Sequence, residues 1–281
     1  MRGTDVDYLS CSKAAELMGV SRSTVLRYCE VGEIRSHSTL GGHRRIEAGE
    51  VTRWLSGKQS KSRKRSNRSS VPLSRFTSQY VADQLLVGKL SKLSPIVDPV
   101  IVRKKSVCWL VDNFLSPAMS EIGARWVTGG INYADERRAT TNIRLLFRQL
   151  SGARRTSSPN AIAVGATLEG DYSDLASTAI ELAALELEMD AFHVGANLPV
   201  PTLAQVAQQL GAQVVWVSYC HIQDPESTIE QNRSLREMLP NGVRLAIGGG
   251  ALYPELLRQM DYDFCGRSCA DFQSYLKPFR V

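Results

Sequence analysis

The spacing of apolar residues changes along the chain, and the first patterned stretch covers residues 10–55. Short apolar groups, one of which includes Leu17, recur there at helical spacing and end at glycines. Ser12 and Ser21 are the expected helix N-caps. The pattern predicts helices at 12–18, 22–31 and 47–55, and strands at 34–38 and 43–46 around a turn at 40–42. Two helices joined by a tight turn and followed by a hairpin form a winged helix-turn-helix.

The second stretch, residues 77–151, carries apolar residues at helical spacing throughout. Pro95 and Pro99 are expected to bracket a break, and Gly129-Gly130 is expected to separate the last two helices. The predicted helices span residues 80–93, 100–114, 115–127 and 133–150. Four helices with short connections predict a four-helix bundle.

From residue 160 onward, short apolar runs alternate with amphipathic segments. The predicted strands are 161–165, 191–194, 214–218, 244–247 and a last strand at Phe264. The predicted helices are 173–188, 201–210, 228–239, one that starts at Tyr253 and one at the C-terminus. Alternating strands and helices indicate a doubly wound parallel sheet of Rossmann-like type, whose ligands bind at the carboxyl ends of the strands.

The predicted fold class is therefore α and α/β multidomain. The winged helix-turn-helix occupies residues 1–57, a basic linker 58–76, the four-helix bundle 77–152 and the Rossmann-like domain 158–281. The linker assignment rests on residues 58–70, which contain six cations and no apolar residue. This segment fits a solvated tether or a further set of phosphate contacts.

Composition is that of an ordinary globular protein, with 43% apolar and 22% charged residues. The apolar runs are too short to span a membrane, and the N-terminal residues do not form a signal peptide. The six cysteines follow no disulfide framework, and the Cys265-x3-Cys269 spacing lacks the second pair of a zinc site. We therefore expect a cytoplasmic protein with reduced thiols, no metal site and no membrane partner.

Charge is distributed unevenly along the chain. Residues 1–76 hold 15 Lys and Arg against 7 Asp and Glu, whereas the whole chain holds 34 against 28. The net charge is therefore positive only at the end that contains the helix-turn-helix. This asymmetry indicates that the N-terminal end meets a polyanion and the rest does not.

The predicted second helix and the hairpin carry the residues that would contact duplex DNA. A recognition helix presents polar side chains near its N-terminal end to base edges and phosphates, and a wing adds phosphate or minor-groove contacts. The candidate DNA-binding residues are Arg22, Ser23, Thr24, Arg27 and Tyr28 on the helix and His43, Arg44 and Arg45 on the wing. The alternative for this stretch is a small helical domain that binds protein.

Residues 7–56, with the Gly41-Gly42-His43-Arg44-Arg45 turn, resemble the winged helix-turn-helix of the MerR and excisionase-like families. Residues 78–278 resemble the cobalamin-binding module of methionine-synthase-like proteins, corrinoid carriers and cobalamin-dependent, light-responsive MerR-type regulators. In the bundle the resemblance rests on Trp126 followed after nine residues by Glu136 and Arg137. The light-responsive relatives have Glu-His at that pair, so Arg137 departs from the family.

In the α/β part, the family carries an Asp/Glu-x-His-x-x-Gly loop whose His is the lower axial cobalt ligand. The corresponding residues here are Glu169, Asp171 in place of His, and Asp174 in place of Gly. The family's Ser-x-Leu becomes Ser218-Tyr219-Cys220, and the glycine turn near the nucleotide tail is Gly248-Gly249-Gly250. The resemblance thus implies a ligand pocket formed by Trp126, Glu136, Arg137, Glu169, Asp171, Ser218, Gly248 and Gly249.

The departures change what this pocket is expected to bind. A carboxylate is a harder ligand than imidazole and serves cobalt poorly, and Asp174 adds a charged side chain where the family has glycine. His-ligated cobalamin is therefore not expected, unless His193 or His221, near strand ends, replaces the missing ligand. The cofactor stays unknown, and both another tetrapyrrole and the absence of a ligand are left open. Two roles are open for Arg137. It forms an ion-pair network with Glu136 and Asp171 that closes the pocket, or it holds an anionic group of a different ligand.

These observations favour a DNA-binding transcriptional regulator of MerR type whose C-terminal region senses a signal, mediates oligomerisation, or both. The alternatives are a light sensor dependent on cobalamin or another tetrapyrrole, a corrinoid methyl carrier, and an oligomerising scaffold with an empty pocket. The sequence contains no catalytic triad, P-loop or metal-ligand cluster, so we expect no enzyme activity. The expected partners are duplex DNA and further copies of the chain, as a dimer or a tetramer.

Overall fold

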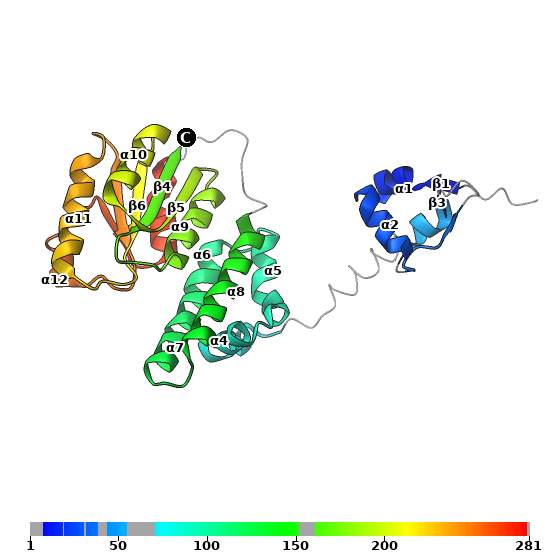
Figure 1. The fold of residues 1–281 in the computed structure, drawn as a ribbon, viewed down its shortest axis with the longest axis horizontal. Coiled ribbons are helices and arrows are strands. Elements are labelled where there is room, and N and C mark those ends of the chain that lie inside the picture. The colour runs from blue at the N-terminus through cyan, green and yellow to red at the C-terminus, as the bar shows by residue number, and fades with distance from the viewer. Residues whose placement is uncertain are drawn as a thin grey trace, which may run out of the picture. The chain divides into compact units, whose positions relative to one another are not determined.

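The computed structural model describes residues 8–18, 20–30, 32–38, 44–54, 71–151 and 161–279. The chain forms two compact units, residues 1–71 and 72–281 (Figure 1). The predicted wing turn, including His43, and residues 55–70, which include residues 58–70 of the predicted linker, lie outside the described residues. No described helix is long and apolar enough to cross a membrane.

The first unit is a small helical domain with a three-stranded antiparallel sheet in the order β1-β3-β2. Its elements are β1 (Tyr8–Ser10), α1 (Cys11–Met18), α2 (Arg22–Glu30), β2 (Ser36–Ser38), β3 (Arg44–Glu47) and a helix at residues 48–54. Strand β1 was not expected, because three residues show too little alternation to be recognised. It pairs with β3, and the buried side chains of α1, α2 and β3 form one core.

Two local predictions for this unit were wrong. Helix α1 begins one residue earlier than the expected cap, and Ser10 Oγ, not Ser12, accepts a hydrogen bond from Lys13 N at 3.2 Å. Leu17 was expected in the core but is 50% exposed, since Ala14, Ala15 and Met18 already fill the buried face. The second cap is as predicted: Thr24 N donates to Ser21 Oγ at 3.2 Å.

The second unit begins with a helical bundle. Its elements are η1 (Leu73–Arg75), α4 (Ser78–Val87), η2 (Leu90–Leu93), α5 (Ser94–Ile101), α6 (Val107–Leu110), the π-helix η3 (Val111–Leu115), α7 (Ser116–Val127) and α8 (Tyr133–Ser151). The expected break between Pro95 and Pro99 is wrong, because both lie within α5. Pro95 occupies the first turn, where a helix needs no N–H donor. The predicted helix 100–114 is instead interrupted at residues 102–106, and Ser106 caps α6 by accepting from Trp109 N at 3.0 Å.

The remainder is a five-stranded parallel sheet in the order β5-β4-β6-β7-β8. The strands are β4 (Ile162–Leu168), β5 (Asp190–Leu198), β6 (Val214–Ser218), β7 (Arg244–Gly248) and β8 (Phe264–Gly266). The helices are α9 (Leu175–Glu186), α10 (Val200–Leu210), α11 (Pro225–Met238), α12 (Pro254–Leu257), α13 (Cys269–Leu276) and the short η4 (Lys277–Phe279). The predicted fold class, mixed α and α/β with a Rossmann-like sheet, is confirmed.

The two faces of this sheet have different neighbours. Helices α10 and α11 cover one face over the main apolar core, while α9 and α13 pack on the other face and contact the bundle (Figure 1). The chain passes from β4 outward to β5 and then returns to β6 on the opposite side of β4. The topological switch point, where such sheets form their ligand crevice, is therefore between the carboxyl ends of β4 and β6.

Strand β4 continues past Gly165, where the sequence predicted its end. The Trp216 indole on the neighbouring strand β6 occupies the space beside Gly165, and a Cβ there would lie 2.0 Å from the ring. The glycine is thus a packing requirement of the central strand and not a turn.

Candidate functional site

Helix α2 carries the first group of predicted DNA contacts. Arg22, Ser23 and Arg27 are exposed, while Thr24 is half-buried and its hydroxyl lies 2.8 Å from Ser21 Oγ in the helix cap. Tyr28 was expected to face outward but is partly buried, with its ring 5.5 Å from that of Trp54 against the small core. The arginines and Ser23 therefore form the accessible part of this surface.

Strand β3 carries the second group. Arg44 lies opposite Ser38, and Arg45 lies between Ser10 of β1 and His37 of β2. Arg45 is exposed and Arg44 half-buried, as expected for neighbours that point to opposite faces of a strand. Within the described part of this unit, no carboxylate forms an ion pair with Arg22, Arg27, Arg44 or Arg45.

Asp171, in the loop after β4, lies at the topological switch point and is 4% exposed. Its Oδ1 accepts from Ser173 N at 2.9 Å, and its Oδ2 accepts from Cys220 N at 2.6 Å and His221 N at 3.1 Å. The carboxylate therefore ties the loop after β4 to the loop after β6. The expectation that Asp171 joins an ion-pair network with Arg137 is wrong, because backbone N–H groups already occupy both of its oxygens.

The loops after β6 and β7 close against each other beside Asp171. Gly249 has a φ of 117°, and a Cβ on it would lie 2.2 Å from the Tyr219 carbonyl oxygen. Tyr219 N donates to the Gly248 carbonyl at 2.8 Å, and the Tyr219 ring is buried in the core beneath α10 and α11. Ser218 is buried at the end of β6, and Glu169 is exposed. None of Glu169, Asp171, Ser218, Gly248 and Gly249 lines the cavity described next.

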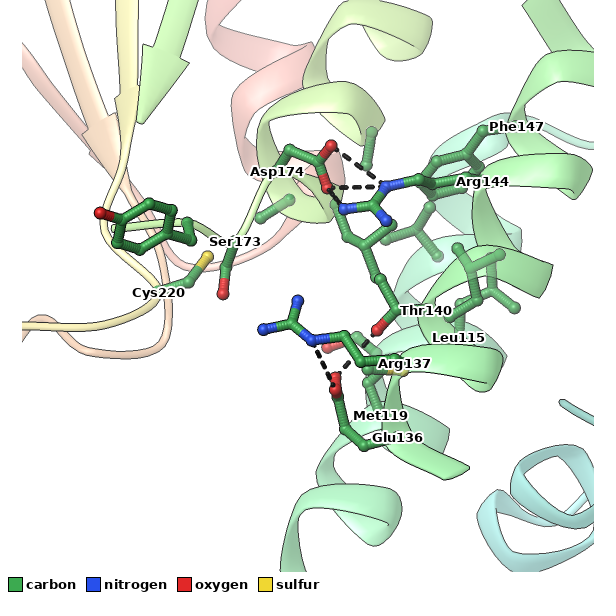
Figure 2. A pocket seen from close by; sticks show the side chains of 17 residues that line it. Leu115, Met119, Glu136, Arg137, Thr140, Arg144, Phe147, Ser173, Asp174 and Cys220 are labelled. Atoms are coloured by element: carbon green, nitrogen blue, oxygen red, sulfur yellow. Dashed lines mark hydrogen bonds and ion pairs between the residues drawn. The ribbon is translucent and has the colours of Figure 1, made fainter. Parts of the chain in front are cut away.

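A cavity of about 270 Å³ lies between the bundle and the sheet domain, and we call it the seam cavity (Figure 2). The bundle contributes Val111, Leu115, Ser116, Met119, Glu136, Arg137, Thr140, Ile143, Arg144 and Phe147. The sheet domain contributes Tyr172, Ser173, Asp174, Leu175, Ala176, Ala179 and Cys220. Of the predicted pocket residues only Glu136 and Arg137 line it. Trp126 was expected to line the pocket or pack in the bundle core, but it is 51% exposed near the end of α7.

Two ion pairs lie on the cavity wall. Arg144 of α8 donates to Asp174 through Nη2 at 2.7 Å and through Nε at 3.2 Å, and this pair joins the bundle to the sheet domain. Arg137 Nε lies 3.5 Å from Glu136 Oε2 and donates to the Tyr133 hydroxyl at 2.7 Å. The sequence reasoning missed Arg144, although its spacing of seven residues from Arg137 places both on one helix face.

His193 and His221 were the candidate replacements for the missing axial ligand. His193 Nδ1 lies 2.9 Å from Ser177 Oγ, which accepts from Trp216 Nε1 at 2.9 Å. Burial lowers the pKa of His193, so the neutral ring is favoured. His221 is exposed, and its backbone N–H is bound to Asp171. Within the described ranges, no three His, Cys, Asp or Glu side chains are arranged to hold a metal ion.

Cys220 places a thiol on the cavity wall beside the Asp171 loop. Burial, together with the negative charges of Asp171 and Asp174, raises the pKa of this thiol to about 12. The group is therefore a neutral, weakly polar part of the wall at physiological pH, and it lacks the thiolate that covalent attachment of a ligand requires.

A second set of contacts joins the bundle to the sheet domain away from the cavity. The Glu186 carboxylate at the end of α9 accepts from Val107 N, at the start of α6, at 2.9 and 3.0 Å. Asp112 of η3 accepts from Cys269 N and Ala270 N, at the start of α13, at 2.9 Å each. The buried Cys108 and Cys269 thiols lie between these two caps, and Cys108 also packs against α9. Each domain thus caps a helix of the other.

Comparison with known sequences gives two findings. Residues 8–59 match the family described as "Helix-turn-helix domain". Among curated proteins, none matches this chain.

The chain is similar in structure to the monomethylamine corrinoid protein of Methanosarcina barkeri, with a TM-score of 0.61 and 12% identity over 74% of this chain and 99% of that one. A cobalamin-binding protein from Desulfitobacterium hafniense DCB-2 has a TM-score of 0.38 and 20% identity over 72% and 98% of the two chains. The chain therefore combines a helix-turn-helix domain with a bundle and sheet that have the fold of a corrinoid protein.

Proposed function

We propose that this chain is a DNA-binding transcriptional regulator of MerR type, whose bundle and sheet domain act in sensing and oligomerisation. The observation that carries the proposal is the helix-turn-helix domain at residues 8–59, in which the exposed arginines of α2 and β3 have no carboxylate partner among the described residues. A group of exposed, unpaired cations on a recognition helix and a wing is the electrostatic footprint of a nucleic-acid interface.

The proposed sensing does not use histidine-ligated cobalamin. The side chain at the expected axial position is Asp171, whose oxygens accept three backbone hydrogen bonds, and the Gly249 turn closes on the Tyr219 backbone beside it. These residues leave no imidazole for cobalt at this position. A corrinoid methyl carrier, the other function that the fold suggests, has no use for a DNA-binding domain.

We further propose that two or four copies of the chain act together, through residues 77–281. One winged helix covers a short DNA site, and operators are usually read by paired modules. The exposed apolar residues of the second unit, such as Val102 and Val127, are available for such contacts.

The test uses mobility shift on a duplex selected from a random pool by the full chain. We expect that replacing Arg44 and Arg45 together with alanine weakens binding by about 1–3 kcal/mol and makes the affinity less dependent on salt, because charge-assisted phosphate contacts are lost. The matched control replaces Arg258 and Arg267, two exposed cations of the second unit, and should not change the affinity. Unchanged affinity in the β3 double variant would contradict the proposal. Light scattering on the same complexes counts the chains on each duplex.

A further inference from the structure

We propose that the seam cavity binds a small carboxylic acid with an apolar tail, and that Arg137 holds its carboxylate. The inference rests on the proposed sensing role of the second unit and names the class of ligand. It is carried by three features of the cavity, namely its walls, the unused edge of the Arg137 guanidinium, and the pairing of the other charges.

The cavity walls are mainly apolar. Leu115, Met119, Ile143 and Phe147 from the bundle face Ala176 and Ala179 of α9. A cavity of about 270 Å³ lies just below the usual range of small-molecule pockets. At the close packing of protein interiors it accepts roughly ten to fifteen non-hydrogen atoms, far fewer than a corrin ring with its tail. The volume and the walls therefore fit a short alkyl chain or a single aromatic ring.

Arg137 supplies a cation with unused donors at the side of this cavity. Its contacts with Glu136 and Tyr133 both involve Nε, and its guanidinium carbon lies 4.7 Å from the centre of the Tyr133 ring. Among the residues that the structure describes, none accepts a hydrogen bond from its Nη groups. Figure 2 shows these groups turned away from Glu136, toward Ser173 and Cys220. A guanidinium oriented by stacking, with one edge unused, is suited to a carboxylate, which binds arginine through two parallel hydrogen bonds.

The remaining charges of the cavity limit the ligand to a single negative charge. The charges of Arg144 and Asp174 compensate each other through three hydrogen-bond contacts, which Nε and Nη2 of the arginine make. Glu136 accepts from Thr140 Oγ1 at 2.9 Å through one oxygen and lies near Arg137 with the other. A cationic ligand would find both carboxylates already engaged. A dianion such as phosphate would be repelled more strongly than a monoanion by Glu136 and Asp174, and Asp174 already compensates the charge of Arg144. A monocarboxylate matches the single charge of the Arg137 guanidinium.

The ligand in this position would contact both domains. Its carboxylate would lie between Arg137 of α8 and Ser173 in the β4–α9 loop, and its tail would lie between the bundle helices and α9. Because Ser173 N is bound to Asp171, the ligand would act on the same loop that joins β4 to β6. Binding therefore favours one arrangement of the bundle relative to the sheet domain, which is what a sensor requires.

The experiment measures binding of straight-chain carboxylates, from hexanoate to dodecanoate, to the full chain by calorimetry without DNA. Octan-1-ol serves as the uncharged probe of equal chain length. We expect the affinity to rise about fourfold for each added methylene until the cavity is full, because burying one methylene strengthens binding by about that factor. Octanoate should bind at least tenfold more tightly than octan-1-ol.

Three variants separate the contribution of the Arg137 charge from that of the apolar walls. Arg137→Gln should lower the affinity for octanoate at least tenfold and change the affinity for octan-1-ol by less than twofold. Arg138→Gln, which removes an exposed neighbouring cation of α8, should change neither. Ala179→Leu narrows the cavity and should weaken both probes; its circular dichroism spectrum checks that the chain is folded.

Several results would overturn the inference. They are the absence of millimolar or tighter binding by any carboxylate of the series, equal affinity for octanoate and octan-1-ol, an unchanged octanoate affinity in Arg137→Gln, or a visible absorption band from a tetrapyrrole that co-purifies with the chain. If carboxylates fail to bind while the DNA affinity still depends on Arg44 and Arg45, only this inference fails. If they bind but the chain binds no duplex, the proposed function fails.

Discussion

The contact between the bundle and the sheet domain has two edges that differ in kind. At the first, which we call the closed edge, Glu186 caps α6 and Asp112 caps α13, so each domain supplies a carboxylate to a helix N-terminus of the other. At the second, the open edge, an apolar cavity is lined by residues of α8 and α9, and among the described residues the Nη groups of Arg137 have no acceptor. The same two domains are thus joined tightly on one side and leave space on the other.

The difference shows that fixing two domains together does not require filling the space between them. Backbone N–H groups at a helix N-terminus carry partial positive charge, and a carboxylate from the other domain satisfies them in a geometry that tolerates little displacement. With two such caps in place, the opposite edge can be empty or can hold a ligand without loss of the fold. We therefore expect substitutions at the closed edge to affect stability and those at the open edge to affect binding.

The largest effect is expected from Asp112→Ala at the closed edge. This change leaves the N–H groups of Cys269 and Ala270 without their acceptor and removes a negative charge from the start of α13. It should lower the free energy of unfolding by roughly 2–3 kcal/mol, the magnitude for hydrogen bonds to a charged group. Urea unfolding followed by circular dichroism measures the change.

Asp112→Asn is the matched comparison, because it keeps one acceptor oxygen, replaces the other with an NH2 donor and removes the charge. Its loss should be about half as large. The closed edge would not have the role given to it here if Asp112→Ala unfolded at the same urea concentration as the unchanged chain.

A smaller effect is expected from the Arg144–Asp174 ion pair, which borders the open edge. Its side chains are 40% and 25% exposed, so solvent screens the attraction. A double-mutant cycle with Arg144→Gln and Asp174→Asn should give a coupling free energy of about 0.5–1 kcal/mol. A coupling as large as the Asp112 effect would show that the two edges are equally tight and would remove the contrast between them.

Much of the fold followed from patterns in the sequence. Strand β6 is a continuous apolar run and helix α8 has strong helical periodicity, and their predicted ranges agree with the structure to within one residue. The failures occurred where tertiary contacts override local signals. Gly165 was read as the end of a strand, whereas it makes room for Trp216, which is distant in sequence. Pro99 was read as a helix breaker, but it lies inside α5.

The site was harder to predict than the fold. The resemblance to a cobalamin-binding module named Glu136 and Arg137, which line the cavity, but it also named Asp171 and Trp126, which do not. It did not indicate the pair of Arg144 and Asp174 on the cavity wall. The caps formed by Asp112 and Glu186 join residues more than seventy positions apart, and no local pattern announces them. For Arg144, the signal that the sequence offered was its helical spacing from Arg137, which the resemblance had already named. The assignment of Arg22, Ser23, Arg27, Arg44 and Arg45 to a DNA interface stays a prediction, and His43 lies outside the described residues.

The smallest effect concerns His193, which lies behind the Arg144–Asp174 pair and should link the open edge to pH. Burial lowers its pKa below the ordinary value of 6.5, the charge of Arg144 lowers it further, and the charge of Asp174 partly opposes the shift. In the unfolded chain the same ring takes up its proton near pH 6.5. Between that pH and the lower pKa of the folded state, the unfolded chain binds more protons, so stability falls as the pH falls.

The stability that the neutral, buried His193 ring contributes is therefore fully present above about pH 7. It is lost as the pH drops below 6.5 toward the pKa of His193 in the folded chain. The free energy of unfolding of the unchanged chain should decrease more steeply between pH 7 and pH 5 than that of His193→Gln. Asp174→Asn removes the charge that raises the pKa of His193, so in this variant the loss of stability should continue to lower pH. His221→Gln, at an exposed histidine, is the control and should follow the unchanged chain. Parallel curves for the unchanged chain and His193→Gln would mean that burial of this ring does not make stability depend on pH.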